Sequence, residues 1–263
     1  MPEKKMRLTD TDRQHLRQLR KLGLNVRHFF DVGASNGRWS SRISQDFPEA
    51  TFDLFEPLID LAPEYRRNMA ATLSRHPKFR LHKVALGPEC KRGSMFLYPN
   101  NLVGSTALAL DVLPQGAERV EVDMLTIDYT LEEFQISVPN VIKMDVQGCE
   151  LGILEGARKT LPKVEVLLLE CWLARAYGPP TPLLLEVAEW LRHFDFHLWD
   201  FGNGWRCEDG TLIAQDCLFL NARAGVSRLQ DERRQLQPPP AACAPANGRS
   251  AWLDRMRNLL WHP

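Results

Sequence analysis

The stretch "FFDVGASNGRWS", residues 29–40, places a short apolar run directly before a turn of small residues and an amphipathic segment. The turn follows Asp31 and contains Gly33, Ala34, Ser35, Asn36 and Gly37. A strand, a glycine-containing turn and a helix in this order are typical of an open α/β sheet, in which ligands bind beyond the carboxyl ends of the strands. Gly33 permits a tight turn and a close backbone approach, and Gly37 lets the chain enter the helix. The stretch therefore predicts both the fold class and the place of a binding site.

The same alternation of strand and helix continues along the chain. Buried strands are predicted at residues 28–32, 50–57, 79–87, 138–146 and 163–170. Helical periodicity separates them, as at Trp39, Ile43 and Phe47 and in the segments 149–161 and 181–194. An antiparallel pair, 93–98 with 118–125, interrupts this order, and the strands 194–201 and 214–221 follow each other without a helix. These features predict a doubly wound, Rossmann-like α/β sheet with right-handed crossovers and an antiparallel last strand.

The chain divides into four segments by its pattern. Residues 1–25 contain a predicted helix over 8–22, and residues 26–226 form the main domain. Residues 227–250 are rich in Pro and Arg and are predicted to be a disordered linker. Residues 251–263 form a short amphipathic helix with basic side chains. Such a helix can dock on its own domain, or it can make a weak contact with a membrane surface or a protein partner.

Composition and charge exclude several classes of protein. The 263 residues have a formal net charge of zero, with 44% hydrophobic and 25% charged residues, which is typical of a globular protein. Seven Arg against three acidic residues lie in 223–263, so the main domain is acidic and has no electrostatic reason to bind nucleic acid. No apolar stretch is long enough to span a membrane and no secretory signal is visible, so we expect a cytoplasmic protein. The six cysteines show no zinc spacing, so we predict reduced structural thiols and no metal site.

The opening turn favours one cofactor over another. A dinucleotide-binding loop needs a glycine where this chain has Ser35, because the backbone there touches the pyrophosphate. The carboxylate of Asp31 would repel a pyrophosphate but suits a cationic ligand, and Asn36 adds a polar side chain. S-adenosylmethionine carries no phosphate and has an ammonium group. A nicotinamide-dependent oxidoreductase remains the alternative enzyme class, and a non-catalytic cofactor-binding or scaffold module is the alternative outside enzymes.

Further residues fit a nucleoside at the same sheet edge. Glu56 ends the second strand 23 positions after Gly33, near the roughly 20 expected for an acidic residue that accepts ribose hydroxyls. Pro57 stiffens the chain behind it. Ala85 and Leu86, at the end of the third strand, offer apolar walls for an adenine ring.

The fourth and fifth strands carry the candidate catalytic groups. Lys143 and Asp145 share one side of a buried strand, so they either pair with each other or serve a site. Glu170 ends the neighbouring strand and is predicted to lie near Asp145. Asp145 is the first candidate for a general base, with Lys143 and Glu170 tuning it or contacting substrate. A structural ion pair, or two carboxylates that hold a divalent cation, are the alternatives.

Candidate substrate-binding residues are less sharply indicated. Asn101 and Ser105 lie in a polar loop between the inserted strands, where a lid can close. Gln147 follows Asp145, and Trp172 follows Glu170 beside the predicted crevice. An aromatic ring with polar neighbours suits a sugar or another ring system, and a mere sheet-covering role is the alternative.

The motifs taken together resemble the FkbM family of S-adenosylmethionine-dependent methyltransferases over about residues 26–222. The resemblance rests on "FFDVGASNGRWS", "FEP" at 55–57, "VALG" at 84–87, "TID" at 126–128, "IKMDVQGCELGILEGA" at 142–157 and "LLLEC" at 167–171. This chain departs from the family at Gln147, where Glu is frequent, and at Ser35, where Ala is usual.

The resemblance implies a seven-stranded methyltransferase sheet and methyl transfer, usually to a hydroxyl of a sugar or another small natural product. By position, Asp31, Gly33, Asn36 and Gly37 would hold the methionine end of S-adenosylmethionine, and Glu56 its ribose. The identity of the acceptor, and the choice between O- and N-methylation, are left open by the sequence.

Overall fold

The computed structural model describes residues 10–61, 63–97, 104–108 and 116–222. Within these residues, seven strands form one sheet in the order β3-β2-β1-β7-β8-β10-β9. Their bounds are β1 His28–Val32, β2 Thr51–Phe55, β3 Phe79–His82, β7 Val141–Met144, β8 Val166–Trp172, β9 Phe196–Arg206 and β10 Leu212–Asn221. The five strands from β3 to β8 in this order are parallel to one another, whereas β10 is antiparallel to both β8 and β9. The doubly wound sheet with an antiparallel end is confirmed.

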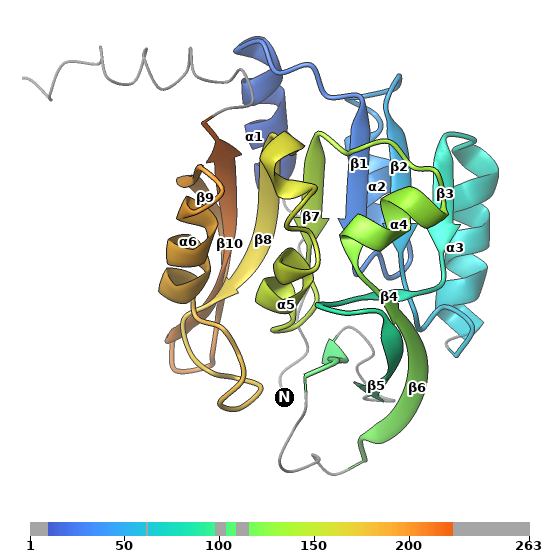
Figure 1. The fold of residues 1–263 in the computed structure, drawn as a ribbon, viewed down its shortest axis with the longest axis vertical. Coiled ribbons are helices and arrows are strands. Elements are labelled where there is room, and N and C mark those ends of the chain that lie inside the picture. Colours follow the sequence, from blue (N-terminus) through green and yellow to red (C-terminus); the bar gives the residue numbers. More distant parts are fainter. Residues whose placement is uncertain (1–9, 62, 98–103, 109–115, 223–263) are drawn as a thin grey trace, which may run out of the picture. The chain divides into compact units, whose positions relative to one another are not determined.

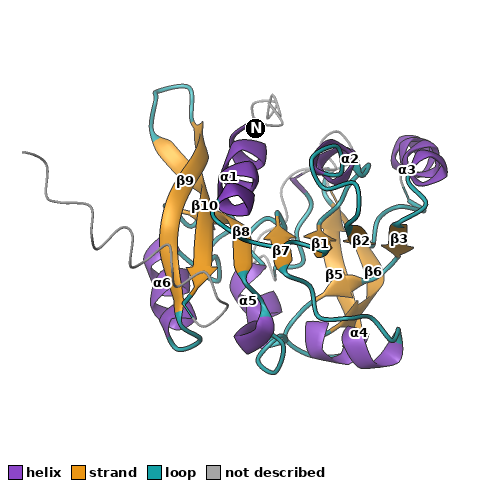
Figure 2. Ribbon diagram, turned by 90° about the horizontal axis from the view of Figure 1, so that it is seen from above, coloured by secondary structure: helices purple, strands orange, loops and turns teal. Residues whose placement is uncertain are grey.

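Helices cover both faces of this sheet (Figure 2). One face carries α1 Asp10–Lys21, α2 Arg38–Ile43 and α3 Pro63–Arg75, and the other carries α4 Ile127–Glu133, α5 Glu150–Glu155 and α6 Leu184–Arg192. Because both faces are covered, β8 is buried along its whole length, as its mostly apolar sequence predicts. The amphipathic α1 buries Leu16 and Leu19 and packs against β9. None of the described helices has the length and apolar character needed to cross a membrane.

A second, three-stranded sheet lies near the carboxyl ends of β1 and β2 (Figure 1). It consists of β4 Ala85–Leu86, β5 Lys91–Leu97 and β6 Glu118–Leu125, in the order β4-β6-β5. The expected antiparallel pair is β5 with β6, and β4 adds to it in parallel with Ala85 beside Met124. The predicted single strand over 79–87 is therefore wrong, because its second half pairs with β6 and leaves the main sheet.

Two helical segments also differ from the sequence-based expectation. α4 was not predicted; Thr126 caps it by accepting a hydrogen bond from the backbone N–H of Tyr129 at 3.0 Å. The helix expected over 149–161 ends at Glu155, and a 3₁₀ turn, Leu161–Lys163, follows. The backbone at Gly156 passes so close to the next element that a Cβ there would lie 2.2 Å from the carbonyl oxygen of Gly87. The predicted linker 227–250 and helix 251–263 lie outside the described residues.

Candidate active site

A cavity of about 360 Å³ opens beyond the carboxyl ends of β1, β2, β7 and β8. Its volume falls in the range of about 300–1,000 Å³ that is usual for small-molecule sites. Residues 33–36, 55–58, 84–86 and 143–147 form one part of the wall, and residues from α1, β9 and β10 form another. The sequence-predicted positions thus meet at one place, at the strand ends where open α/β sheets bind ligands.

The opening turn is shaped by left-handed backbone at Gly33, Ser35 and Gly37, with φ of 73°, 52° and 73°. A Cβ at Gly33 would lie 2.2 Å from the backbone oxygen of Asp145, so no other residue fits there. Gly37 does not line the cavity. A Cβ at Gly37 would lie 3.2 Å from the side chain of Met69 and 3.1 Å from that of Thr72. The absence of a side chain at Gly37 therefore lets α2 pack closely on α3. Gly33 and Ala34, by contrast, line the cavity.

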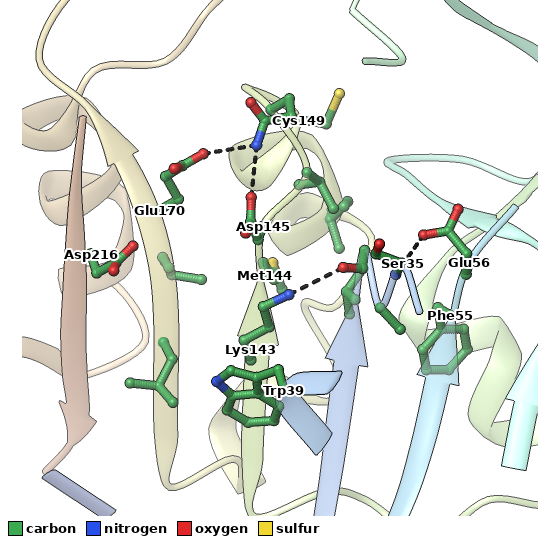
Figure 3. A pocket seen from close by; sticks show the side chains of 18 of the residues that line it. Ser35, Trp39, Phe55, Glu56, Lys143, Met144, Asp145, Cys149, Glu170 and Asp216 are labelled. Carbon is green, nitrogen blue, oxygen red and sulfur yellow. Dashed lines mark hydrogen bonds between the residues drawn. The ribbon is translucent and has the colours of Figure 1, made fainter. Parts of the chain in front are cut away.

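Glu56 lies beside this turn with both carboxylate oxygens engaged (Figure 3). The backbone N–H of Ser35 donates to Oε2 at 2.8 Å, and that of Leu58 donates to Oε1 at 2.9 Å. Burial raises the pKa of Glu56 to about 7, against the lowering effect of these two hydrogen bonds. The carboxylate faces the cavity together with Pro57 and with the apolar side chains of Ala85 and Leu86.

Asp31 and Lys143 form a buried ion pair under the opening turn. They are direct neighbours in the β1–β7 register, and Nζ of Lys143 lies 3.1 Å from Oδ1 of Asp31. Ser40 donates to Oδ2 of Asp31 at 2.7 Å, and Lys143 also donates to the carbonyl oxygen of Gly33 at 3.1 Å. Lys143 lines the cavity, but Asp31 is completely buried and does not. Asp31 therefore supports the turn through Lys143, and its contact with the methionine end of a cofactor stays a prediction.

The ends of β7 and β8 bring Asp145 and Glu170 to the opposite part of the wall (Figure 3). The side-chain amide of Gln147 lies between them and donates to Oδ1 of Asp145 at 2.7 Å and to Oε2 of Glu170 at 2.9 Å. The hydroxyl of Tyr177 donates to Oε1 of Gln147 at 2.6 Å. Asp216 of β10 is the register partner of Glu170 on the neighbouring strand and also lines the cavity. The two predicted catalytic carboxylates are therefore close to each other, and Gln147 joins them.

The predicted substrate-binding residues fall into three groups. Ser105 and Gln147 line the cavity. Asn101 lies outside the described residues. Trp172 is completely buried behind the wall, in edge-to-face contact with Tyr177 and Trp205, and only Trp205 of these aromatic rings lines the cavity.

Part of the wall comes from α1, which corresponds to the helix predicted over 8–22 and was not among the predicted site elements. Asp12 and His15 line the cavity. Nε1 of Trp39 donates to Oδ2 of Asp12 at 2.9 Å, and Nε2 of His15 lies 3.4 Å from Oδ2 of Asp200. Burial raises the pKa of Asp12. No sequence signal indicated these contacts, because they depend on how α1 packs against β9.

Cysteine and metal chemistry receive little support from the wall. Cys149 lines the cavity, but burial raises the pKa of its thiol to about 11, so it is protonated and a poor nucleophile near neutral pH. Among the residues that the structure describes, no three His, Cys, Asp or Glu side chains are grouped so that they could hold a metal ion.

Comparison with known proteins agrees with this geometry. Residues 31–198 match the methyltransferase FkbM domain. "Methyltransferase 1" of Beauveria bassiana (strain ARSEF 2860) is 26% identical over 142 residues, which are 48% of this chain and 56% of that protein. Among solved structures, an FkbM methyltransferase from Methylobacillus flagellatus KT is 18% identical, with a TM-score of 0.48 over 74% of this chain and 43% of that one. Precorrin-6y C5,15-methyltransferase from Geobacter metallireducens GS-15 is 12% identical, with a TM-score of 0.45 over 82% and 91%.

The sheet order, the cavity at its strand ends and the domain match define a protein of the Rossmann-like methyltransferase class. Because the domain match covers most of the chain, the chain belongs to the FkbM methyltransferase family. It spans little more than half the length of the curated relative.

Proposed function

We propose that this protein is an S-adenosylmethionine-dependent methyltransferase that methylates a hydroxyl of a sugar or another small natural product. The observation that carries the proposal is a single cavity shared by two sets of residues. Glu56, Ala85 and the opening turn form one end of it, and Asp145 and Glu170 form the other.

The residues at the first end fit the cofactor. Each oxygen of Glu56 accepts one backbone hydrogen bond, and a carboxylate oxygen has room for a second donor such as a ribose hydroxyl. Ala85 and Leu86 supply the apolar walls that an adenine ring needs. Gly33, Ala34 and Asn36 line the cavity and would hold the methionine end of the cofactor. Lys143 stabilises their turn by donating a hydrogen bond to the carbonyl oxygen of Gly33. When bound, S-adenosylmethionine would supply an electrophilic methyl group on a sulfonium centre.

The residues at the second end would bind and deprotonate the acceptor. A hydroxyl that attacks the methyl group must lose its proton, and a positioned base contributes about 10²–10⁴-fold to such a step. Asp145 is our candidate base. Glu170 beside it would accept a second hydrogen bond from the molecule that is methylated. Holding both reactants in line is the larger contribution, because it turns a bimolecular reaction into an effectively unimolecular one.

The structure disfavours the dinucleotide alternative. In a nicotinamide-binding loop the backbone N–H groups of the turn point at the pyrophosphate. Here the N–H of Ser35 already donates to the carboxylate of Glu56, and that carboxylate would stand against a pyrophosphate.

Isothermal titration calorimetry tests the cofactor assignment directly. We expect the full chain to bind S-adenosylhomocysteine and not NADH, and we expect Glu56→Ala to weaken that binding at least tenfold. Absence of binding at millimolar S-adenosylhomocysteine would contradict the proposal and favour a scaffold role. With radiolabelled S-adenosylmethionine, transfer to sugars and to small phenols then tests the acceptor class, with Asp145→Asn as the inactive control.

A further inference from the structure

Gln147 adopts a backbone conformation that its residue type disfavours. Its φ is 56°, in the left-handed region, and Gly148 follows with a φ of 95°. A non-glycine residue is strained in this region, so the surrounding structure must hold it there. Thr106 does so in part by donating its hydroxyl hydrogen to the carbonyl oxygen of Gln147 at 2.8 Å. The turn therefore aims the Gln147 side chain at a fixed place.

The side chain at that place uses all its polar atoms. Its amide nitrogen has two hydrogens, and one goes to Asp145 and the other to Glu170, while its oxygen accepts from Tyr177. The reversed amide would place an oxygen against two carboxylates, so the Tyr177 hydroxyl and the carboxylates together fix one orientation. Gln147 is only 4% exposed, so water does not replace these bonds readily.

This orientation restricts where Asp145 and Glu170 can carry a proton. An oxygen that already accepts an amide N–H is the weaker base of its carboxylate, so protonation is favoured at Oδ2 of Asp145 and at Oε1 of Glu170. Each amide hydrogen bond also favours the ionised carboxylate over the protonated one.

We propose that Gln147, oriented by Tyr177, is a positioning residue that keeps Asp145 and Glu170 ionised side by side and directs an incoming proton to their other oxygens. The inference rests on the proposed function for its catalytic meaning, because the incoming proton is that of the methyl acceptor. A Glu at this position would remove both donors and add a third negative charge.

Other titratable groups also act on this pair. Glu150 of α5 interacts with Glu170, and burial raises the pKa of Glu150 to about 8, so it is mostly protonated at neutral pH. Asp12 of α1 interacts with Asp145. The remaining titratable groups of the wall nearby are Asp216, Lys143, His15 and Cys149.

Carboxyl ¹³C NMR of the full chain, labelled at Asp and Glu, tests the proposal without an acceptor. Asp145→Asn and Glu170→Gln assign the two signals. We expect Gln147→Glu to raise the pH at which at least one of them titrates by about one pH unit or more. Tyr177→Phe removes only a hydroxyl, and we expect a smaller rise together with a shifted side-chain amide signal of Gln147.

Gln135→Glu is the matched control, because Gln135 is exposed and has the same left-handed backbone, with a φ of 51°. It adds the same charge and should leave both titrations unchanged. Unchanged titrations in Gln147→Glu, or in Tyr177→Phe if Gln147→Glu does not fold, would overturn the inference. Binding of S-adenosylhomocysteine, measured on the same samples, reports separately on the proposed function.

Discussion

The proposed ribose-binding role of Glu56 would couple cofactor binding to pH, because the pKa of Glu56, about 7, lies well above that of an exposed glutamate. Ribose hydroxyls donate hydrogen bonds and so prefer the ionised carboxylate, which means that binding should lower this pKa. Affinity for S-adenosylhomocysteine should therefore rise with pH through 7 and then level off. Between pH 6 and pH 8 the ionised fraction changes about tenfold, so we expect a comparable change in Kd.

Calorimetry at several pH values, in buffers of different ionisation enthalpy, measures both the affinity and the proton released. Glu56→Gln keeps the shape of the side chain but removes its titration, so its weaker binding should not depend on pH in this range. A wild-type Kd that is constant from pH 6 to 8 would contradict the role assigned to Glu56.

At the scale of residues, the sequence predicted the contents of the site better than the roles within it. Glu56, Asp145, Glu170 and the opening turn could be placed because strand ends of a parallel sheet meet at one edge. The role of Asp31 could not, because its partner Lys143 follows from the register between β1 and β7. Periodicity along one strand shows only that Lys143 and Asp145 share a face. It does not predict the register between neighbouring strands, which pairs Lys143 with Asp31.

Three neighbouring strands are tied together by Asp53 of β2, which is completely buried. It accepts hydrogen bonds at 2.6 Å from His28 of β1 and from Arg80 and His82 of β3. Although burial opposes ionisation, these bonds hold the pKa of Asp53 well below its usual range. A lowered pKa in the folded state stabilises the protein above the unfolded value of about 3.8 and loses this effect as the pH falls below it.

Asp53→Asn should therefore destabilise the protein by about 3 kcal/mol at pH 7, since it replaces a buried carboxylate that accepts hydrogen bonds from His28, Arg80 and His82. The difference from wild type should shrink below about pH 4, because there the carboxyl of the unfolded wild-type chain is protonated while that of the folded protein is still ionised. Urea unfolding at pH 3 to 7 measures both effects. Asp60→Asn, which breaks the exposed Lys83–Asp60 pair, is the control and should change stability by less than about 1 kcal/mol.

At the scale of elements, local periodicity predicted the helices and strands that a single apolar face defines. It failed where a long-range partner decides the outcome. β4 leaves the main sheet because β6 pairs with it, and α5 ends early where Gly156 passes Gly87. For α1, the pattern predicted the helix itself but not that its residues Asp12 and His15 would line the cavity.

The whole molecule uses more chain for its cavity than the family match covers. The domain match spans residues 31–198, whereas the described cavity wall runs from Asp12 to Leu218. The lining segments outside the match are α1, β9 beyond residue 198, and β10. Asp12 of α1 interacts with Asp145, and Asp216 of β10 pairs in register with Glu170. Under the proposed function, these segments line the acceptor end of the cavity.

Removal of residues 227–263 should leave cofactor binding intact, because every described residue of the cavity wall precedes that segment. We expect the chain 1–226 to bind S-adenosylhomocysteine with a Kd within twofold of the full chain and to unfold at the same urea concentration. Removal of residues 1–21 should instead weaken binding and stability, because it deletes Asp12, His15 and the buried Leu16 and Leu19 of α1.

Sedimentation with anionic vesicles tests the amphipathic segment 251–263: if the full chain co-sediments and 1–226 does not, the segment contacts membranes. A loss of S-adenosylhomocysteine binding in 1–226 would show that the tail contributes to the site itself.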